Sequence, residues 1–210
     1  MISSPAAISR NATVTTGSEA GGAWLESRGG PVNFKWTLSG DGKLRLDYDY
    51  ALTGDFIYHG ITFDLPEEAM KSMSWLGEGP SRVWQNRLQG TWLGLHGTKR
   101  HVLQPGESFQ YPEFEGFFAG VRWARLDTTA GPLTIASGDP TAYLRVGTPR
   151  NSHPTTTVDF PAGDLSFLHA IPGMGSKFKT AEVSGPSAQP AKAAGTYRGK
   201  LVFFIGEAPR

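Results

Sequence analysis

Apolar and polar residues alternate strictly along two neighbouring stretches of the chain. From residue 32 to 38 every second residue is apolar, and from 43 to 50 two leucines and two tyrosines alternate with charged residues. A period of two with charges on one face predicts half-buried antiparallel strands. Ser39-Gly40-Asp41-Gly42 lies between them and has the composition of a tight turn. The two stretches therefore predict a β-hairpin.

Similar short apolar stretches recur, separated by Gly- and Pro-containing turns. We expect further strands at 56–65, 73–76, 90–103, 120–126, 133–137, 142–146, 165–171 and 197–205, and one helical turn between 64 and 72. We place Trp36 and Trp92 in the core. About ten strands with almost no helix predict an all-β, antiparallel β-sandwich. Residues 1–22 are small and polar and predict a flexible lead-in, 23–210 a single β-sandwich domain, and 175–196 an exposed excursion.

Composition narrows the classes of protein. The 27 Gly and 15 Pro among 210 residues favour turns and short strands. The absence of Cys excludes disulfides, thiolate catalysis and Cys-based zinc sites. A net charge of +1 without a basic block gives no indication of a nucleic-acid or membrane partner. Residues 1–22 contain no signal peptide, and an absence of Cys fits any compartment, including the bacterial periplasm and exterior.

The stretch from Met73 to Arg87 stands out for its chemistry. It begins as an apolar strand end, breaks at Gly77 and at Gly79-Pro80, and continues with Arg82, Trp84 and Arg87. One interpretation is a structural corner whose Trp caps the core and whose Arg pairs with a carboxylate. The other is a surface that binds a sugar, because such sites combine a flat aromatic ring with planar polar groups.

Other candidate groups are carboxylates and histidines. Glu113 and Glu115 lie among four aromatic residues, a setting that raises carboxyl pKa values by desolvation, or they are solvated edge residues paired with arginine. The five His show no i,i+4 spacing, so we expect no metal site and no cofactor. His59, His101 and His169 could form an acid–base pair with Glu113 or Glu115. An alternative for His59, on an apolar strand face, is a core histidine.

Three blocks resemble the C-terminal β-sandwich domain, the small-chain type, of family 2 glycoside hydrolases such as β-galactosidase. The first is Trp75-Leu-Gly-Glu-Gly-Pro with its polar run to Arg87. The second is Tyr111-Pro112, Gly116 and Val121-Arg-Trp123, and the third runs from Leu168 to Gly175. Glu113 and Glu115 flank the position of the family's Glu, and Asp164 stands near that of its active-site aromatic. The resemblance implies a galactose mutarotase-like supersandwich, here as a fragment or a shortened form.

The resemblance also implies a function. The two catalytic Glu of family 2 enzymes are on a separate barrel of some 250 residues, so this chain should not hydrolyse a glycoside alone, although it would be part of a glycoside hydrolase. We expect a noncatalytic domain that binds saccharide or completes the active-site mouth of its partner, the catalytic barrel. The expected carbohydrate-binding residues are Arg82, Trp84, Arg87, Tyr111, Glu113, Glu115, Trp123, His169 and Lys177. The alternative is a freestanding mutarotase-like sugar enzyme with a His/Glu acid–base pair.

Overall fold

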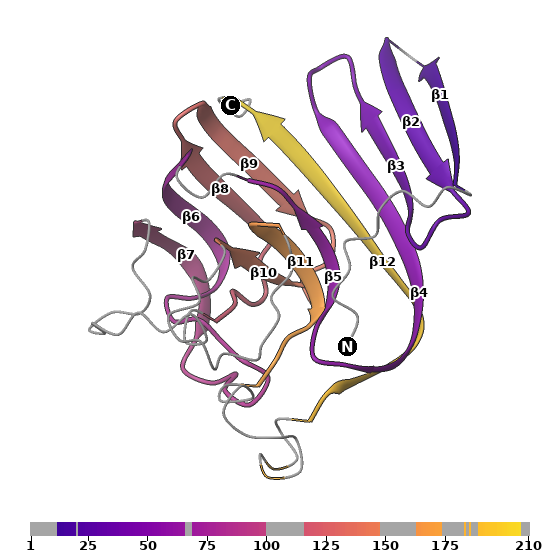
Figure 1. Cartoon of the computed structure of the whole chain (residues 1–210). Coiled ribbons are helices and arrows are strands. Elements are labelled where there is room, and N and C mark those ends of the chain that lie inside the picture. Colours follow the sequence, from indigo (N-terminus) through magenta and orange to yellow (C-terminus); the bar gives the residue numbers. More distant parts are fainter. Residues whose placement is uncertain are drawn as a thin grey trace.

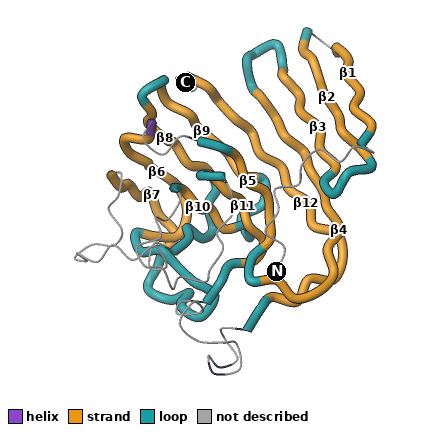
Figure 2. The backbone as a smooth tube through the Cα atoms, viewed as in Figure 1, coloured by secondary structure: helices purple, strands orange, loops and turns teal. Residues whose placement is uncertain are grey.

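The computed structural model describes residues 12–19, 21–65, 69–99, 116–147, 163–173, 183, 185 and 189–206. Within them the chain consists almost entirely of β-strands and connecting loops (Figure 2). The strands are β1 (Thr13–Glu19), β2 (Gly22–Arg28), β3 (Asn33–Leu38), β4 (Leu44–Phe56), β5 (His59–Phe63), β6 (Met70–Gly79), β7 (Trp92–Lys99), β8 (Trp123–Thr128), β9 (Gly131–Ser137), β10 (Tyr143–Val146), β11 (Leu165–Ala170) and β12 (Ala191–Ile205). The predicted all-β class is confirmed.

The strands form two antiparallel sheets. The larger has nine strands in the order β1-β2-β3-β4-β12-β9-β8-β6-β7, and the smaller has three in the order β10-β11-β5. The smaller sheet lies against the middle of the larger one, while β1, β2 and β3 extend beyond it (Figure 1). The two layers make a sandwich, and among the described strands the smaller sheet covers only part of the inner face of the larger one.

Alternation accounts for the hairpin of β3 and β4. Phe34 pairs with Tyr48 and Trp36 with Leu46 on the inner face, whereas Lys35 pairs with Asp47 on the outer face. Opposite charges across neighbouring strands add a small stabilisation to that pairing. The predicted hairpin is therefore present, and its second strand continues past the expected turn at Gly54-Asp55 to Phe56.

Other predicted boundaries differ from the observed ones. Thr13–Glu19, inside the expected flexible lead-in, forms β1, and Gly22–Arg28 forms β2. β1 is mostly exposed and β2 is only partly buried, and the residues of both that share the inner face of β3 are mainly small or polar, so they give a weak hydrophobic pattern. Ala191–Thr196, expected in an exposed excursion, begins β12, since it pairs with the extension of β4.

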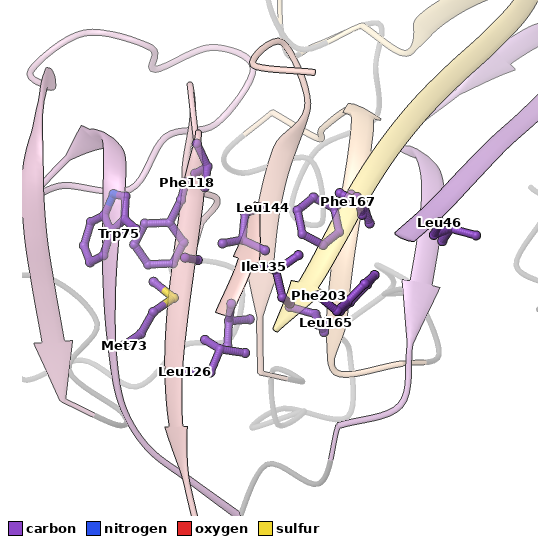
Figure 3. Close-up of a cluster of buried hydrophobic side chains, with 14 of the residues drawn as sticks. Leu46, Met73, Trp75, Phe118, Leu126, Ile135, Leu144, Leu165, Phe167 and Phe203 are labelled. Atoms are coloured by element: carbon purple, nitrogen blue, oxygen red, sulfur yellow. The ribbon is translucent and has the colours of Figure 1, made fainter. Parts of the chain in front are cut away.

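The main core lies between the sheets. Ile135 of β9, Phe203 of β12 and Phe167 of β11 face one another from the two layers (Figure 3). Trp36 packs at the margin of this core, with ring centroids 6.3 Å from Phe63 and 5.4 Å from Phe203. The prediction for Trp92 was wrong, because its side chain is 61% exposed. Trp92 lies on β7, the last strand of the larger sheet, and its cross-strand neighbour Gly79 has no side chain to cover it.

No helix in the described part of the chain has the length and hydropathy that crossing a bilayer requires.

Candidate functional site

The three sequence blocks singled out above meet at one end of the sandwich. The Val83 N–H donates to the Phe117 carbonyl at 2.8 Å, and the Phe117 N–H donates to the Val83 carbonyl at 3.0 Å. The Gln85 N–H donates to the Pro172 carbonyl at 3.0 Å. Residues 82–87, 116–119 and 168–173 are called the signature end below. Backbone hydrogen bonds thus join segments that are far apart in the chain.

A small core of its own holds the signature end together. It consists of the buried residues Val83, Trp84, Phe117, Ala119, Leu168 and Ile171, with Tyr58 and Tyr143 packed against them. Trp84 is only 2% exposed, so both faces of its ring are covered by other side chains. This burial matches the interpretation of Trp84 as a residue that caps the core.

Two glycines permit close packing, Gly116 within the signature end and Gly79 beside it. Gly116 has φ +62°, and a Cβ there would lie 2.8 Å from ring carbon Cζ2 of Trp84 and 2.9 Å from Cβ of Arg82. At Gly79, which precedes Pro80 through a cis peptide bond, a Cβ would lie 2.7 Å from the His96 ring. A side chain at either position would displace a ring, so the close approach depends on glycine.

Polar groups lie at the signature end and beside it. The Arg82 guanidinium lies 5.0 Å from the Phe118 ring centroid, and that of Arg87 lies 5.8 Å from the Trp84 ring centroid, both within cation–π range. The Glu78 carboxylate accepts a hydrogen bond from the Thr91 hydroxyl at 3.0 Å.

Glu78 was not among the predicted site residues. Burial raises the pKa of Tyr143, and the negative charge of Glu78 raises it further. The available signal was its position between the two glycines of the first block, where a strand residue must face away from the core.

The predicted site residues are distributed over several places. Arg82, Trp84 and Arg87 lie together at the signature end. Trp123 lies on β8 next to Ala124, which faces the core, so Trp123 is on the outer face of the larger sheet. His169 lies on β11. Tyr111, Glu113, Glu115 and Lys177, and also His101, lie outside the described residues.

His169 belongs to a buried hydrogen-bonded chain that the sequence did not reveal. The Tyr50 hydroxyl lies 2.9 Å from Nδ1 of His59 and 2.7 Å from Nδ1 of His169. Nε2 of His169 lies 3.4 Å from a carboxylate oxygen of Asp139. A hydroxyl has one proton, so Tyr50 donates to one Nδ1 and accepts from the other. A proton on Nε2 of His169, facing Asp139, makes His169 the acceptor and His59 the donor.

Burial keeps the side chains of Tyr50, His59 and His169 neutral. It lowers the pKa of His59 to about 4, with the charge of His169 adding to the effect. Burial also lowers the pKa of His169, and the negative charge of Asp139 opposes that shift. Burial raises the pKa of Tyr50. His59 and the His169 side chain are each 9% exposed. Tyr50, His59 and His169 therefore join β4 of the larger sheet to β5 and β11 of the smaller one as uncharged side chains.

A charged groove of about 560 Å³ runs over β3, β4 and β12. Its aspartates have nearby partners: Asp47 lies 2.6 Å from Arg45 and 3.8 Å from Lys200, and Asp49 lies 2.8 Å from Asn33. Exposed pairs of this kind contribute little free energy each and are typical of a solvated sheet face. The lining also includes Arg28, Lys35, Arg198 and Asp139, so the groove has five basic and three acidic side chains. The described residues contain no group of three or more potential metal ligands.

The three sequence blocks thus form one structural unit within an antiparallel sandwich. The family model described as "Beta galactosidase small chain" matches residues 6–182, and the chain belongs to this family. The resemblance stated from the sequence is thereby confirmed. No curated protein gives a significant match. Among solved structures, galactose 1-epimerase from Lactobacillus acidophilus NCFM is similar, with 12% sequence identity and a TM-score of 0.45, over 93% of this chain and 67% of that one.

Proposed function

We propose that this chain is a noncatalytic domain of a β-galactosidase-type enzyme, whose signature end contacts saccharide at the active-site mouth of a separate catalytic barrel. The observation that carries the proposal is the convergence of three distant segments, Val83 with Phe117 and Gln85 with Pro172, in one well-packed end. A surface held by its own core is preorganised, and preorganisation reduces the entropy lost on binding.

The polar groups at this end suit a saccharide. Arg82 and Arg87 present planar guanidinium groups held near aromatic rings, and Glu78, whose N–H donates to the Ala119 carbonyl, presents a carboxylate beside this end. Planar groups of both kinds form paired hydrogen bonds with neighbouring sugar hydroxyls. Because the ring of Trp84 is covered, an aromatic platform has to come from another residue. Tyr111 is our candidate, with Glu113, Glu115 and Lys177, which adjoin the signature end in sequence.

The inner face of β1, β2 and β3 is our candidate surface for contact with a partner domain. Val14, Leu25 and Leu38 are exposed there, on strands that extend beyond the smaller sheet. Exposed apolar side chains on one face are typical of a surface that another domain covers. We assign this face to contact with the rest of the enzyme.

The acid–base alternative receives less support from the geometry. A mutarotase-like mechanism needs a histidine nitrogen that reaches substrate, whereas His59 and His169 are buried. Both ring nitrogens of His169 already have partners, Tyr50 and Asp139. The two histidines fit a structural role better than a catalytic one.

Calorimetric titration with galactosides, glucuronides and mannosides, alongside hydrolysis and mutarotation assays, tests the proposal. We expect binding without turnover. Arg87→Ala should weaken binding, whereas Arg28→Ala, an exposed arginine on β2, should not. Turnover by the isolated chain would overturn the noncatalytic assignment. Equal saccharide affinity of the wild type and Arg87→Ala would show that saccharide does not bind at this part of the signature end.

Docking requires a second experiment. The chain is mixed with a β-galactosidase catalytic polypeptide that lacks this domain, and complex formation is measured by sedimentation. We expect a complex, and Leu25→Lys with Leu38→Lys should weaken it because both substitutions charge the proposed contact face. The absence of any complex would contradict the proposed partner.

A further inference from the structure

Strand β7 forms the edge of the larger sheet and carries an unusual surface. It is the last strand of the nine and pairs with β6, the only described strand beside it. Leu93 is 63% and Leu95 is 70% exposed, and Trp92 on the other face is exposed as well. Natural edge strands are normally protected by charged residues, Pro or bulges, because an open edge pairs readily with another strand.

The sequence around β7 also lacks charge. Residues 88–98 contain no Asp, Glu, Lys or Arg, and this run is flanked by Arg87 and Lys99. The hairpin of β3 and β4, by contrast, alternates charges along its outer face. An uncharged edge offers nothing to recognise an acidic or a basic partner, and it meets no repulsion from a second copy of itself.

The exposed leucines continue into an apolar row on the outer face. Leu95 pairs with Leu76, and Leu76 pairs with Trp123 on β8. Trp123 pairs with Ala136 on β9, which pairs with Val202 on β12. The outer face of a sandwich is ordinarily polar. This row therefore marks an apolar surface that begins at the open edge.

We propose that β7 pairs antiparallel with β7 of a second copy of this chain, about a twofold axis at Gly94. Such pairing keeps each face of the sheet on the same side in both copies. It places Leu93 opposite Leu95 of the second copy on the outer face, and Trp92 opposite His96 on the inner face. The run Trp-Leu-Gly-Leu-His is nearly symmetric about Gly94, so each apolar residue meets an apolar or aromatic one.

The charged residues near β7 also favour a second copy of this chain as the partner of the strand. In this register Lys99 of one copy lies opposite Gln89 of the other, so no like charges face each other. The interface is isologous, and the apolar rows of the two copies join into one surface across the axis. This inference is independent of the proposed function, since it concerns the isolated chain and a surface outside the signature end.

Sedimentation of the full chain over a range of concentrations tests the dimer. The wild type should reach twice the single-chain mass of 22.7 kDa. Leu93→Lys combined with Leu95→Lys should remain at the single-chain mass, because both residues are exposed and neither supports the fold. Ile205→Lys, at a residue that is 77% exposed on β12, is the matched control and should leave the dimer intact. A wild type that stays monomeric overturns the proposal, also when it associates only after a catalytic polypeptide is added. A dimer that still forms with both lysine substitutions overturns it as well.

The register has its own test because the chain has no Cys. Leu93→Cys and Leu95→Cys are prepared separately, one with an affinity tag, and are mixed under oxidising conditions. Directly opposite residues lie within disulfide range, whereas diagonal positions lie beyond it. The mixture should give the disulfide-linked pair of tagged and untagged chains. Crosslinking of either variant with itself at the same yield would contradict the axis at Gly94.

Discussion

Acid should destabilise this protein through its buried histidines. His59 has a pKa of about 4 in the folded state and about 6.5 when unfolded. Between these values the unfolded chain binds more protons than the folded one, so the free energy of unfolding rises with pH and falls as pH is lowered. The stabilisation is complete above about pH 6.5 and is lost as pH falls towards 4. His169, whose pKa is also lowered, contributes in the same direction.

The size of the effect follows from the two pKa values. At pH 5 the unfolded His59 is almost fully protonated, whereas the folded one is mostly neutral. Each unit of pKa difference corresponds to about 1.4 kcal/mol, so the change from pH 7 to pH 5 should cost about 2 kcal/mol through His59 alone. That is a large share of the stability of an ordinary domain.

Urea unfolding followed by tryptophan fluorescence at pH 7, 6 and 5 measures this. His59→Asn keeps a side-chain amide close to the position of Nδ1 but does not titrate, so the pH dependence should become shallower. His96→Asn changes a histidine of β7 that lies outside the buried chain and serves as the control. A free energy of unfolding that stays flat or increases from pH 7 to pH 5 would refute the reasoning. So would a pH dependence that His59→Asn leaves unchanged.

Three further predictions concern packing. Gly116→Ala should lower the free energy of unfolding by about 1–3 kcal/mol, because it adds a methyl group against Trp84 at positive φ. Gly147→Ala, also at positive φ but with open space around it, should cost less. Urea unfolding of both variants measures the difference, and equal costs would contradict the prediction. Trp84→Ala should cost about 3–5 kcal/mol and Trp92→Ala within about 0.5 kcal/mol, and thermal or urea unfolding that ranks them the other way would disprove the burial argument. Tyr50→Phe should cost about 2 kcal/mol or more, since it leaves two buried ring nitrogens without their shared hydroxyl, and a neutral effect on urea unfolding would show that the hydrogen-bonded chain contributes nothing.

Local patterns predicted those strands that have one face in the core and one in water. β3 and β4 show it best, because Trp36 and Leu46 alternate with Lys35 and Asp47. β1 and β2 were not predicted, since only Val14 and Leu25 are large apolar residues among many small and polar ones on the inner face of this edge hairpin. Long-range contacts were also beyond reach. The 2.7 Å contact between Tyr50 and His169 joins residues 119 apart, and no spacing in the sequence indicates it.

The local sequence could not show which tryptophan is buried and which is exposed either. Trp84 and Trp92 are eight residues apart with similar surroundings in sequence, yet one is buried and the other exposed. The difference arises from other segments: residues 116–119 and 168–171 close over Trp84, whereas the edge position of β7 leaves Trp92 open. The signature blocks were found by resemblance, and their convergence became visible only in three dimensions.

The last described strand, β12, occupies the middle of the larger sheet. β12 pairs with β4 on one side and with β9 on the other, so without it β1–β4 and β6–β9 would be two unconnected sheets. During synthesis, the N-terminal hairpins must therefore wait for about 150 further residues before the two halves can join. Contacts of such high sequence separation slow folding and leave strand edges open meanwhile. We expect deletion of residues 191–205 to abolish cooperative folding rather than merely to shorten the protein.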